Sequence, residues 1–251
     1  MDGIIIKDDA RYCYTEAYLK GRGYTFHGLE THPSRLDFAI FPFKEKLDEA
    51  YDDEYFSQFD KGAHIFSGVR SGYLTEKCEK HDLRYHVMME DKDTTVKNAV
   101  PTSEGVIAYL IYNLQRTVAF SRILIIGYGV CGRDLALRLS ALGANVSALV
   151  RNREKLCNAQ ADSIVPIYLH DFDPANYDAI INTVPAQVLS NEMIKTDALL
   201  IDIASAPYGF DMEFAKKQNS RSSLLPGIPG KYAVKTSGET LGEYVELILR
   251  G

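Results

Sequence analysis

The stretch "RILIIGYGVCG" (residues 122–132) decides the fold, because an apolar run passes directly into three glycines. Residues 123–126 are short, apolar and rich in isoleucine, as expected of a buried strand. Gly127, Gly129 and Gly132 then follow in the spacing Gly-x-Gly-x-x-Gly. Glycines in this spacing suit any tight turn between a strand and a helix, so the neighbouring sequence must distinguish a simple turn from a binding site.

An amphipathic helix follows the glycines. Leu135, Leu139 and Leu142 recur at helical spacing, and Gly143 supplies a C-terminal stop before the next apolar run at 146–150. Strand, turn, helix and strand therefore form one βαβ unit. In this setting the first glycine permits the turn, the second lets the backbone approach a pyrophosphate, and the third lets the helix pack on the strand. The helix N-terminus adds free amides and partial positive charge, so we predict a dinucleotide site.

The rest of the second half repeats short apolar runs separated by helical stretches. These runs are predicted strands at 123–126, 146–150, 164–167, 179–181, 199–204 and 223–225. The sequence predicts an α/β protein with a Rossmann-type doubly wound parallel sheet, which places ligands at the carboxyl ends of its strands. A final amphipathic helix opens near Thr236 and is assigned to this domain.

The first half predicts a second, smaller α/β domain. Candidate strands lie at 3–6, 37–43, 64–68 and 84–89, and candidate helices at 11–21 and 72–81. The acidic and aromatic stretch 44–62 is interpreted as a solvated loop or amphipathic helix. Pro101 biases Val100 away from helix, so a linking helix is expected to start there. The predicted organisation is an N-terminal substrate domain (1–97), a linking helix (98–121) and a dinucleotide-binding domain (122–251), with the ligand cleft between the domains.

The end of the second strand discriminates between NAD and NADP. An NAD site usually has an acidic residue there to bind the ribose hydroxyls. This chain has Val150 at that position, followed by Arg151, Asn152 and Arg153. A guanidinium binds a 2'-phosphate through paired charged hydrogen bonds, so NADP is predicted, with NAD as the alternative. The two arginines are also compatible with ordinary solvated loop charges.

Polar and small residues follow the fourth and fifth strands, where the nicotinamide half of the cofactor is expected. Tight turns would use the same residue types. The complete set of predicted cofactor-binding residues is Gly127, Tyr128, Gly129, Val130, Gly132, Arg151, Asn152, Arg153, Asn182, Thr183, Pro185, Ala204, Ser205 and Gly227.

Composition excludes several function classes. The net charge of -6 argues against a nucleic-acid or anionic-membrane surface. No apolar run reaches the roughly 18 residues of a membrane span, and the N-terminal residues lack a signal-peptide pattern, so a cytoplasmic protein is expected. The four cysteines and six histidines show no metal-ligand spacing, so neither a metal nor a disulfide is predicted.

The motifs together resemble a known family. "NAVPTSEG" (98–105), "GYGVCG" (127–132), "INTVP" (181–185), "IDIASAPYGFD" (201–211) and "LPGIPGKYAVKTSGE" (225–239) are similar to the A subunit of bacterial dipicolinate synthase. "DDARY" also resembles the family's Gly-Asp-x-Arg turn, with Asp9 and Arg11 at matching positions. The resemblance implies an NADP-dependent oxidoreductase that converts dihydrodipicolinate to dipicolinate in sporulation, together with a flavoprotein-like second subunit. We also expect a homo-oligomer.

A dicarboxylate substrate needs groups that neutralise its charges. Predicted substrate-binding residues are Arg11, Ser67, Gly68, Arg70 and Thr102. Glu104 and Lys235 are candidate catalytic groups, although a Glu in a first helical turn often serves only as a capping residue. No residue is identified as the base from the sequence. Alternative functions are another NAD(P)-dependent oxidoreductase of a small carboxylate, or a noncatalytic dinucleotide-binding subunit that docks a partner.

Overall fold

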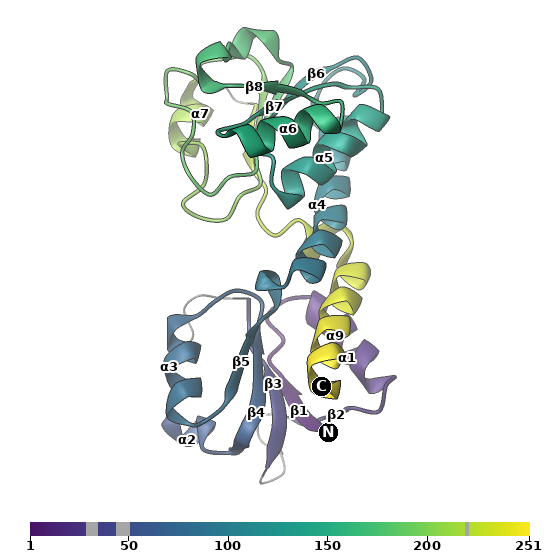
Figure 1. The fold of residues 1–251 in the computed structure, drawn as a ribbon, viewed down its shortest axis with the longest axis vertical. Helices are drawn as coiled ribbons and strands as arrows, with labels where there is room; N and C mark the ends of the chain where they lie inside the picture. The colour runs from purple at the N-terminus through teal and green to yellow at the C-terminus, as the bar shows by residue number, and fades with distance from the viewer. Residues whose placement is uncertain (29–34, 44–50, 219–220) are drawn as a thin grey trace. The chain divides into compact units, whose positions relative to one another are not determined.

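The computed structural model describes residues 1–28, 35–43, 51–218 and 221–251. The chain divides into two compact units, each built around one parallel sheet (Figure 1). Unit 1 comprises Met1–Asn98 and Ala233–Gly251, and unit 2 comprises Ala99–Tyr232. The predicted α/β class is confirmed. None of the helices within these described ranges has the length and apolar character needed to cross a membrane.

Unit 2 has six parallel strands in the order β11-β10-β9-β6-β7-β8. The order runs outward in both directions from β6, which is the doubly wound arrangement that leaves a switch point between β6 and β9. The strands correspond to the six predicted apolar runs. Their bounds are β6 (Arg122–Ile126), β7 (Asn145–Leu149), β8 (Val165–Ile167), β9 (Ala179–Asn182), β10 (Leu199–Asp202) and β11 (Ser222–Leu224).

Helices cover both faces of this sheet, so its central strand β6 is buried on both sides. Ile123 and Ile125 face one core, together with Leu135 and Leu139, whereas Leu124 faces the other. The helices are α4 (Lys92–Asn113), α5 (Val130–Ala141), α6 (Arg153–Ala161), α7 (Met212–Gln218) and α8 (Pro229–Tyr232), with 3₁₀ helices η2 (Leu169–Asp171) and η3 (Pro174–Asn176).

Unit 1 has five parallel strands in the order β2-β1-β3-β4-β5. Its strands are β1 (Asp2–Ile5), β2 (Thr25–Phe26), β3 (Leu36–Ile40), β4 (Phe59–Ser67) and β5 (Arg84–Val87). Its helices are α1 (Arg11–Lys20), α2 (Asp53–Phe56), α3 (Gly72–Lys80), η1 (Met88–Glu90) and α9 (Val234–Arg250), and it includes the first turns of α4.

The last helix belongs to unit 1, whereas the sequence assigned it to the dinucleotide-binding domain. Helix α9 lies beside α1 (Figure 1), and its Leu241 and Val245 enter the same core as Tyr12 and Phe66. A Cβ atom on Gly238 would lie 2.3 Å from the carbonyl oxygen of Arg11, so the two helices touch through their backbones. The predicted boundary at 97 lies next to the end of the first segment of unit 1 at Asn98, whereas most of the predicted linking helix (98–121) falls in unit 2.

One local expectation was wrong, and another holds in part. Helix α4 starts at Lys92 and continues through Pro101, and Val100 is helical. The flanking Ala99 and Ser103 are 1% exposed, so burial of this segment outweighs the hydrogen bond that a proline removes.

In the acidic stretch, residues 44–50 lie outside the described residues. The remainder contains the short helix α2, with Phe56 buried and Glu54 exposed, as expected of an amphipathic helix. Phe59, by contrast, begins β4 and lies in the core of unit 1.

Candidate functional site

The glycine turn joins β6 to α5 at the carboxyl edge of the six-stranded sheet. Gly127 has φ +92°, a conformation that side-chain-bearing residues rarely adopt. A Cβ atom on Gly132 would lie 2.3 Å from the carbonyl oxygen of Gly127, so this position admits no side chain. The turn therefore has two glycines that its own geometry requires.

Gly129 differs from the other two glycines, because a Cβ atom there would meet nothing within 4 Å. It is the N-cap residue of α5 and offers no side chain to accept from the first helical amides. Such amides have no partner within a helix and, with the helix dipole, favour an anion. Open space beside free donors is what a bound pyrophosphate requires.

Two other residues of the predicted turn have different surroundings. Val130 is 43% exposed at the start of α5. Tyr128 is buried, and its hydroxyl donates a hydrogen bond to Asp162 at 2.8 Å. Arg133 also binds Asp162, with Nε and Nη2 at 2.6 and 2.8 Å from its two carboxylate oxygens. These bonds lower the pKa of Asp162 to about 2, the contribution of Arg133 being the larger.

No pattern in the sequence indicates this cluster of three side chains. Asp162 follows α6 and lies 29 positions from Arg133, and no local motif predicts a pairing at that separation.

Asn182 and Thr183, predicted to bind cofactor, use their side chains within the protein. Asn182 donates from Nδ2 to the Val184 carbonyl at 2.8 Å and to Asp202 at 2.9 Å. Thr183 donates from its hydroxyl to the carbonyl of Ile126 at 2.8 Å and lies against Gly132. Both residues therefore support the turn from inside.

Asp202 organises the loop that follows β10. Its side chain is fully buried and accepts from Asn182 and from the amides of Ala204, Gly209 and Phe210, at 2.6–3.1 Å. A Cβ atom on Gly209 would lie 2.2 Å from the Asn182 side chain. The loops after β9 and β10 are thus joined. The other predicted cofactor-binding residues lie on these two loops and on the loop after β11. Ala204 is buried, whereas Pro185, Ser205 and Gly227 are exposed.

The loop after β7 presents its arginines to solvent. Arg151, Asn152 and Arg153 are all exposed, and Asn152 caps α6 by accepting from the Lys155 amide at 2.9 Å. Within the described ranges, no ion pair engages the guanidinium of Arg151 or Arg153. Both side chains therefore remain available to a phosphate.

Unit 1 brings several predicted substrate residues to the carboxyl edge of its own sheet. The Arg11 side chain is only 7% exposed, pairs with Asp9 at 2.7 Å and lies 4.0 Å from the centre of the Phe43 ring. The same ring contacts Gly68, where a Cβ atom would lie 2.0 Å from it. Arg11 is thus a buried, already neutralised group.

Ser67 ends β4, and Arg70 follows it at the same edge. The Ser67 hydroxyl donates to the Val69 carbonyl at 2.7 Å and contacts the Tyr85 hydroxyl at the same distance. Arg70 is more than half exposed and forms a two-bonded pair with Glu90. Arg70 is therefore the accessible residue of the two, and its charge is paired with Glu90.

The candidate catalytic groups lie in different units. In unit 2, Thr102 is buried, and Glu104 is exposed with its carboxylate 3.7 Å from Arg138. In unit 1, Lys235 is 70% exposed and lies 3.9 Å from Glu239. Ser103 was not among the predicted residues, yet its buried hydroxyl has no hydrogen-bond partner in the described part of the chain.

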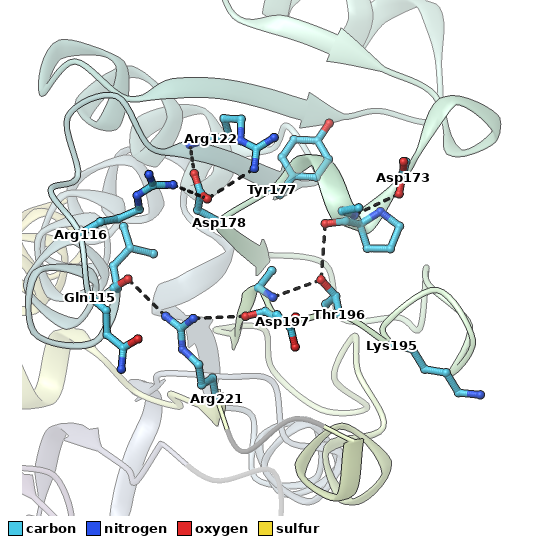
Figure 2. A pocket seen from close by; sticks show the side chains of 14 residues that line it. Gln115, Arg116, Arg122, Asp173, Tyr177, Asp178, Lys195, Thr196, Asp197 and Arg221 are labelled. Atoms are coloured by element: carbon cyan, nitrogen blue, oxygen red, sulfur yellow. Dashed lines mark hydrogen bonds and ion pairs between the residues drawn. The ribbon is translucent and has the colours of Figure 1, made fainter.

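A separate cavity of about 730 Å³ lies at the opposite, amino edge of the sheet in unit 2 (Figure 2). Arg116 and Arg122 both point to Asp178, at 2.6 and 3.6 Å. Arg221 donates to the backbone carbonyls of Leu114 and Asp197. These guanidinium groups bind protein acceptors, and the cavity lies at the edge of the sheet opposite the glycine turn.

Known proteins resemble the chain over most or all of its length. The A subunit of dipicolinate synthase from Bacillus subtilis (strain 168) is 30% identical over 190 residues, which is 74% of this chain and 64% of that protein's length. The crystal structure of the A subunit of dipicolinate synthase from Bacillus halodurans matches with TM-score 0.90 and 24% identity, over 100% of this chain and 98% of the other. No protein-family model matches the chain.

More distant structures share the fold. A D-lactate dehydrogenase from Treponema pallidum matches with TM-score 0.69 and 13% identity, over 100% of this chain and 97% of the other. An NAD-dependent formate dehydrogenase from Staphylococcus aureus matches with TM-score 0.62 and 12% identity, over 100% and 95%. These two structures share the fold of the chain over its whole length. By sequence over 190 residues and by fold over its whole length, the chain is similar to the A subunit of dipicolinate synthase.

Proposed function

We propose that this chain is an NADP-dependent oxidoreductase that oxidises dihydrodipicolinate to dipicolinate, as the name of its relative suggests. The observation that carries the proposal is the glycine turn at the switch point of the sheet. It combines open space at Gly129 with a helix N-terminus that no side chain of its N-cap residue caps, and it ends the strand from which the sheet winds in both directions.

The preference for NADP rests on the loop after β7. Arg151 and Arg153 are exposed and have no carboxylate partner in the described structure, and no acidic residue stands at Val150 to bind ribose hydroxyls. A 2'-phosphate placed there gains charged hydrogen bonds from the two guanidinium groups.

The double substitution R151A/R153A tests this preference. We expect roughly a hundredfold weaker NADPH binding, because two charge-assisted contacts worth about 1.5 kcal/mol each are lost, with little change for NADH. Lys155→Ala is a matched control, since that cation follows in the same helix but pairs with Glu154. Equal losses of affinity for NADPH and NADH would show that the arginines do not recognise the 2'-phosphate.

For the substrate, we propose that the segment after β4 holds one carboxylate through the amides of residues 68–70, with the exposed Arg70 guanidinium exchanging Glu90 for that carboxylate. Gly68 is required there by the Phe43 ring, and Arg11 lies over that ring while remaining paired with Asp9. Arg11 then positions the segment and does not bind the substrate charge itself.

In the proposed reaction, NADP⁺ held at the glycine turn and the Arg151–Arg153 loop would supply the acceptor for a hydride from a ring carbon, and the neighbouring proton would leave to the protein as the ring becomes aromatic. The chain holds the donor carbon in place and receives that proton. Glu104 is the candidate acceptor, whereas Lys235 is 70% exposed and lacks the burial that would leave a lysine amine free to accept a proton. Wild-type turnover at unchanged substrate affinity in Glu104→Gln would eliminate Glu104, and the same result in Lys235→Met would exclude any role for Lys235.

The decisive experiment combines binding and turnover. The proposal predicts that NADPH raises the melting temperature of the purified chain, and that dihydrodipicolinate with NADP⁺ yields dipicolinate and NADPH. A parallel reaction includes the flavoprotein-like second subunit. If NADPH binds but neither reaction forms dipicolinate, a different carboxylate substrate or a noncatalytic binding role replaces this proposal. Absence of NADPH binding would reject all three functions.

A further inference from the structure

We propose that Asp162 is a positioning residue for the dinucleotide, acting through Tyr128 and Arg133 to hold the glycine turn in its binding conformation. The inference rests on the proposed function. Tyr128 stands between Gly127 and Gly129, and it is the only turn residue in 127–129 with a side chain.

The three side chains form a closed set of bonds. Asp162 accepts from the Tyr128 hydroxyl at 2.8 Å and from Arg133 Nε at 2.6 Å on one oxygen, and from Arg133 Nη2 at 2.8 Å on the other. Tyr128 is 3% exposed and belongs to the core that contains Ile123 and Leu135. The turn is therefore anchored on its protein side, while its other side is open at Gly129.

The placement of these charges is unfavourable without the cluster. Asp162 caps the C-terminal end of α6, where the helix dipole repels a carboxylate, and Arg133 lies in the first turn of α5, where the dipole repels a cation. Pairing the two removes both costs. It also commits the Arg133 cation to a protein carboxylate, so that the backbone amides remain the donors available to a pyrophosphate.

Anchoring affects affinity because a turn that is already ordered loses less conformational freedom on binding. Asp162 further joins the turn to α6, the helix that begins at Asn152 and Arg153. The glycine turn is thus joined to the C-terminal end of α6, and the segment proposed to bind the 2'-phosphate lies at the other end of that helix.

The test measures NADPH affinity and the apo melting temperature in Asp162→Asn, Arg133→Met and their double variant. We expect about tenfold weaker NADPH binding in each single variant, with no further loss in the double variant, since both changes break the same cluster. Asp134→Asn is the matched control, because it breaks an Asp–Arg pair of α5, with Arg138 at 2.7 Å, that does not touch the turn. The control should bind NADPH as the wild type does, at a similar melting temperature.

Tyr128→Phe provides an independent variant that keeps the ion pair and removes only the hydroxyl; it should weaken NADPH binding by a smaller factor. If Asp162→Asn does not fold, Arg133→Met and Tyr128→Phe decide. Unchanged or tighter NADPH binding in the cluster variants, additive losses in the double variant, or losses equal to that of Asp134→Asn would each overturn the inference. Failure of the wild type to bind NADPH would instead reject the proposed function.

Discussion

Gly129 and Gly132 lie three residues apart, yet an added methyl group would meet very different surroundings at the two positions. At Gly132 it would lie 2.3 Å from a backbone oxygen, whereas at Gly129 it would meet open space. Gly132→Ala should therefore lower the free energy of unfolding by about 2 kcal/mol, a typical cost of overpacking. Gly129→Ala should leave stability nearly unchanged and weaken NADPH binding, because its methyl group occupies ligand space.

Urea unfolding and NADPH titration of both variants measure this contrast. Loss of stability in Gly129→Ala without loss of binding would contradict the assignment of the open space to the ligand. The sequence predicted a tight turn at these glycines, but it could not say which glycine faces the protein and which faces solvent.

Asp202 is the residue on which the loops after β9 and β10 depend. Its carboxylate accepts from three backbone amides and from Asn182. Asp202→Asn places an amide NH₂ where an acceptor is needed, so we expect a loss of about 3 kcal/mol in the free energy of unfolding. Exposed Glu213→Gln serves as the control. A loss no greater than that of the control would show that the loops do not need this carboxylate.

At the scale of elements, β4 and β5 carry a stacked histidine pair. His64 Nδ1 and His86 Nε2 are 3.0 Å apart, so one shared proton suits the pair and two do not. Burial, followed by the influence of His64 and Arg84, lowers the pKa of His86 to about 4, and burial also lowers the pKa of His64.

Because folding depresses the pKa of His86, stability present at neutral pH is lost as pH falls from about 6.5 towards 4. The free energy of unfolding should drop by on the order of 2 kcal/mol across that window. His86→Phe should reduce this pH dependence to the part that the buried His64 contributes, while substitution of the exposed His170 should leave it unchanged. Urea unfolding at several pH values measures this pH dependence. If the free energy of unfolding of His86→Phe falls with pH as steeply as that of the wild type, the assignment of the effect to His86 is refuted.

Most elements of unit 2 follow from local sequence, because each buried strand is a short apolar run and each helix has its own apolar face. The helix through Pro101 was not predictable in this way, since its persistence depends on the burial of Ala99 and Ser103 by distant segments. The same holds for the site. The glycine turn is a local motif, whereas Asp162 reaches it only through tertiary contact.

At the scale of the whole molecule, α9 completes the core of unit 1. Its Leu241 and Val245 pack with Tyr12 and Phe66, so a chain truncated after Tyr232 exposes that core. Hydrogen exchange should show loss of amide protection in β1, β3 and β4 and retained protection in β6 and β9. Retained protection in both sheets would show that unit 1 is stable without α9. The sequence could not assign this helix to a sheet, because an amphipathic pattern reveals an apolar face and not its partner.

The discontinuity of unit 1 has a consequence for synthesis on the ribosome. Chains usually begin to fold from the N-terminus as they emerge. Here, residues 99–232 are translated between the two segments of unit 1, so the second unit has all of its own sequence before the first does. Until residues 233–251 leave the exit tunnel, the nascent N-terminal sheet lacks α9, and α9 does not yet cover Tyr12 and Phe66.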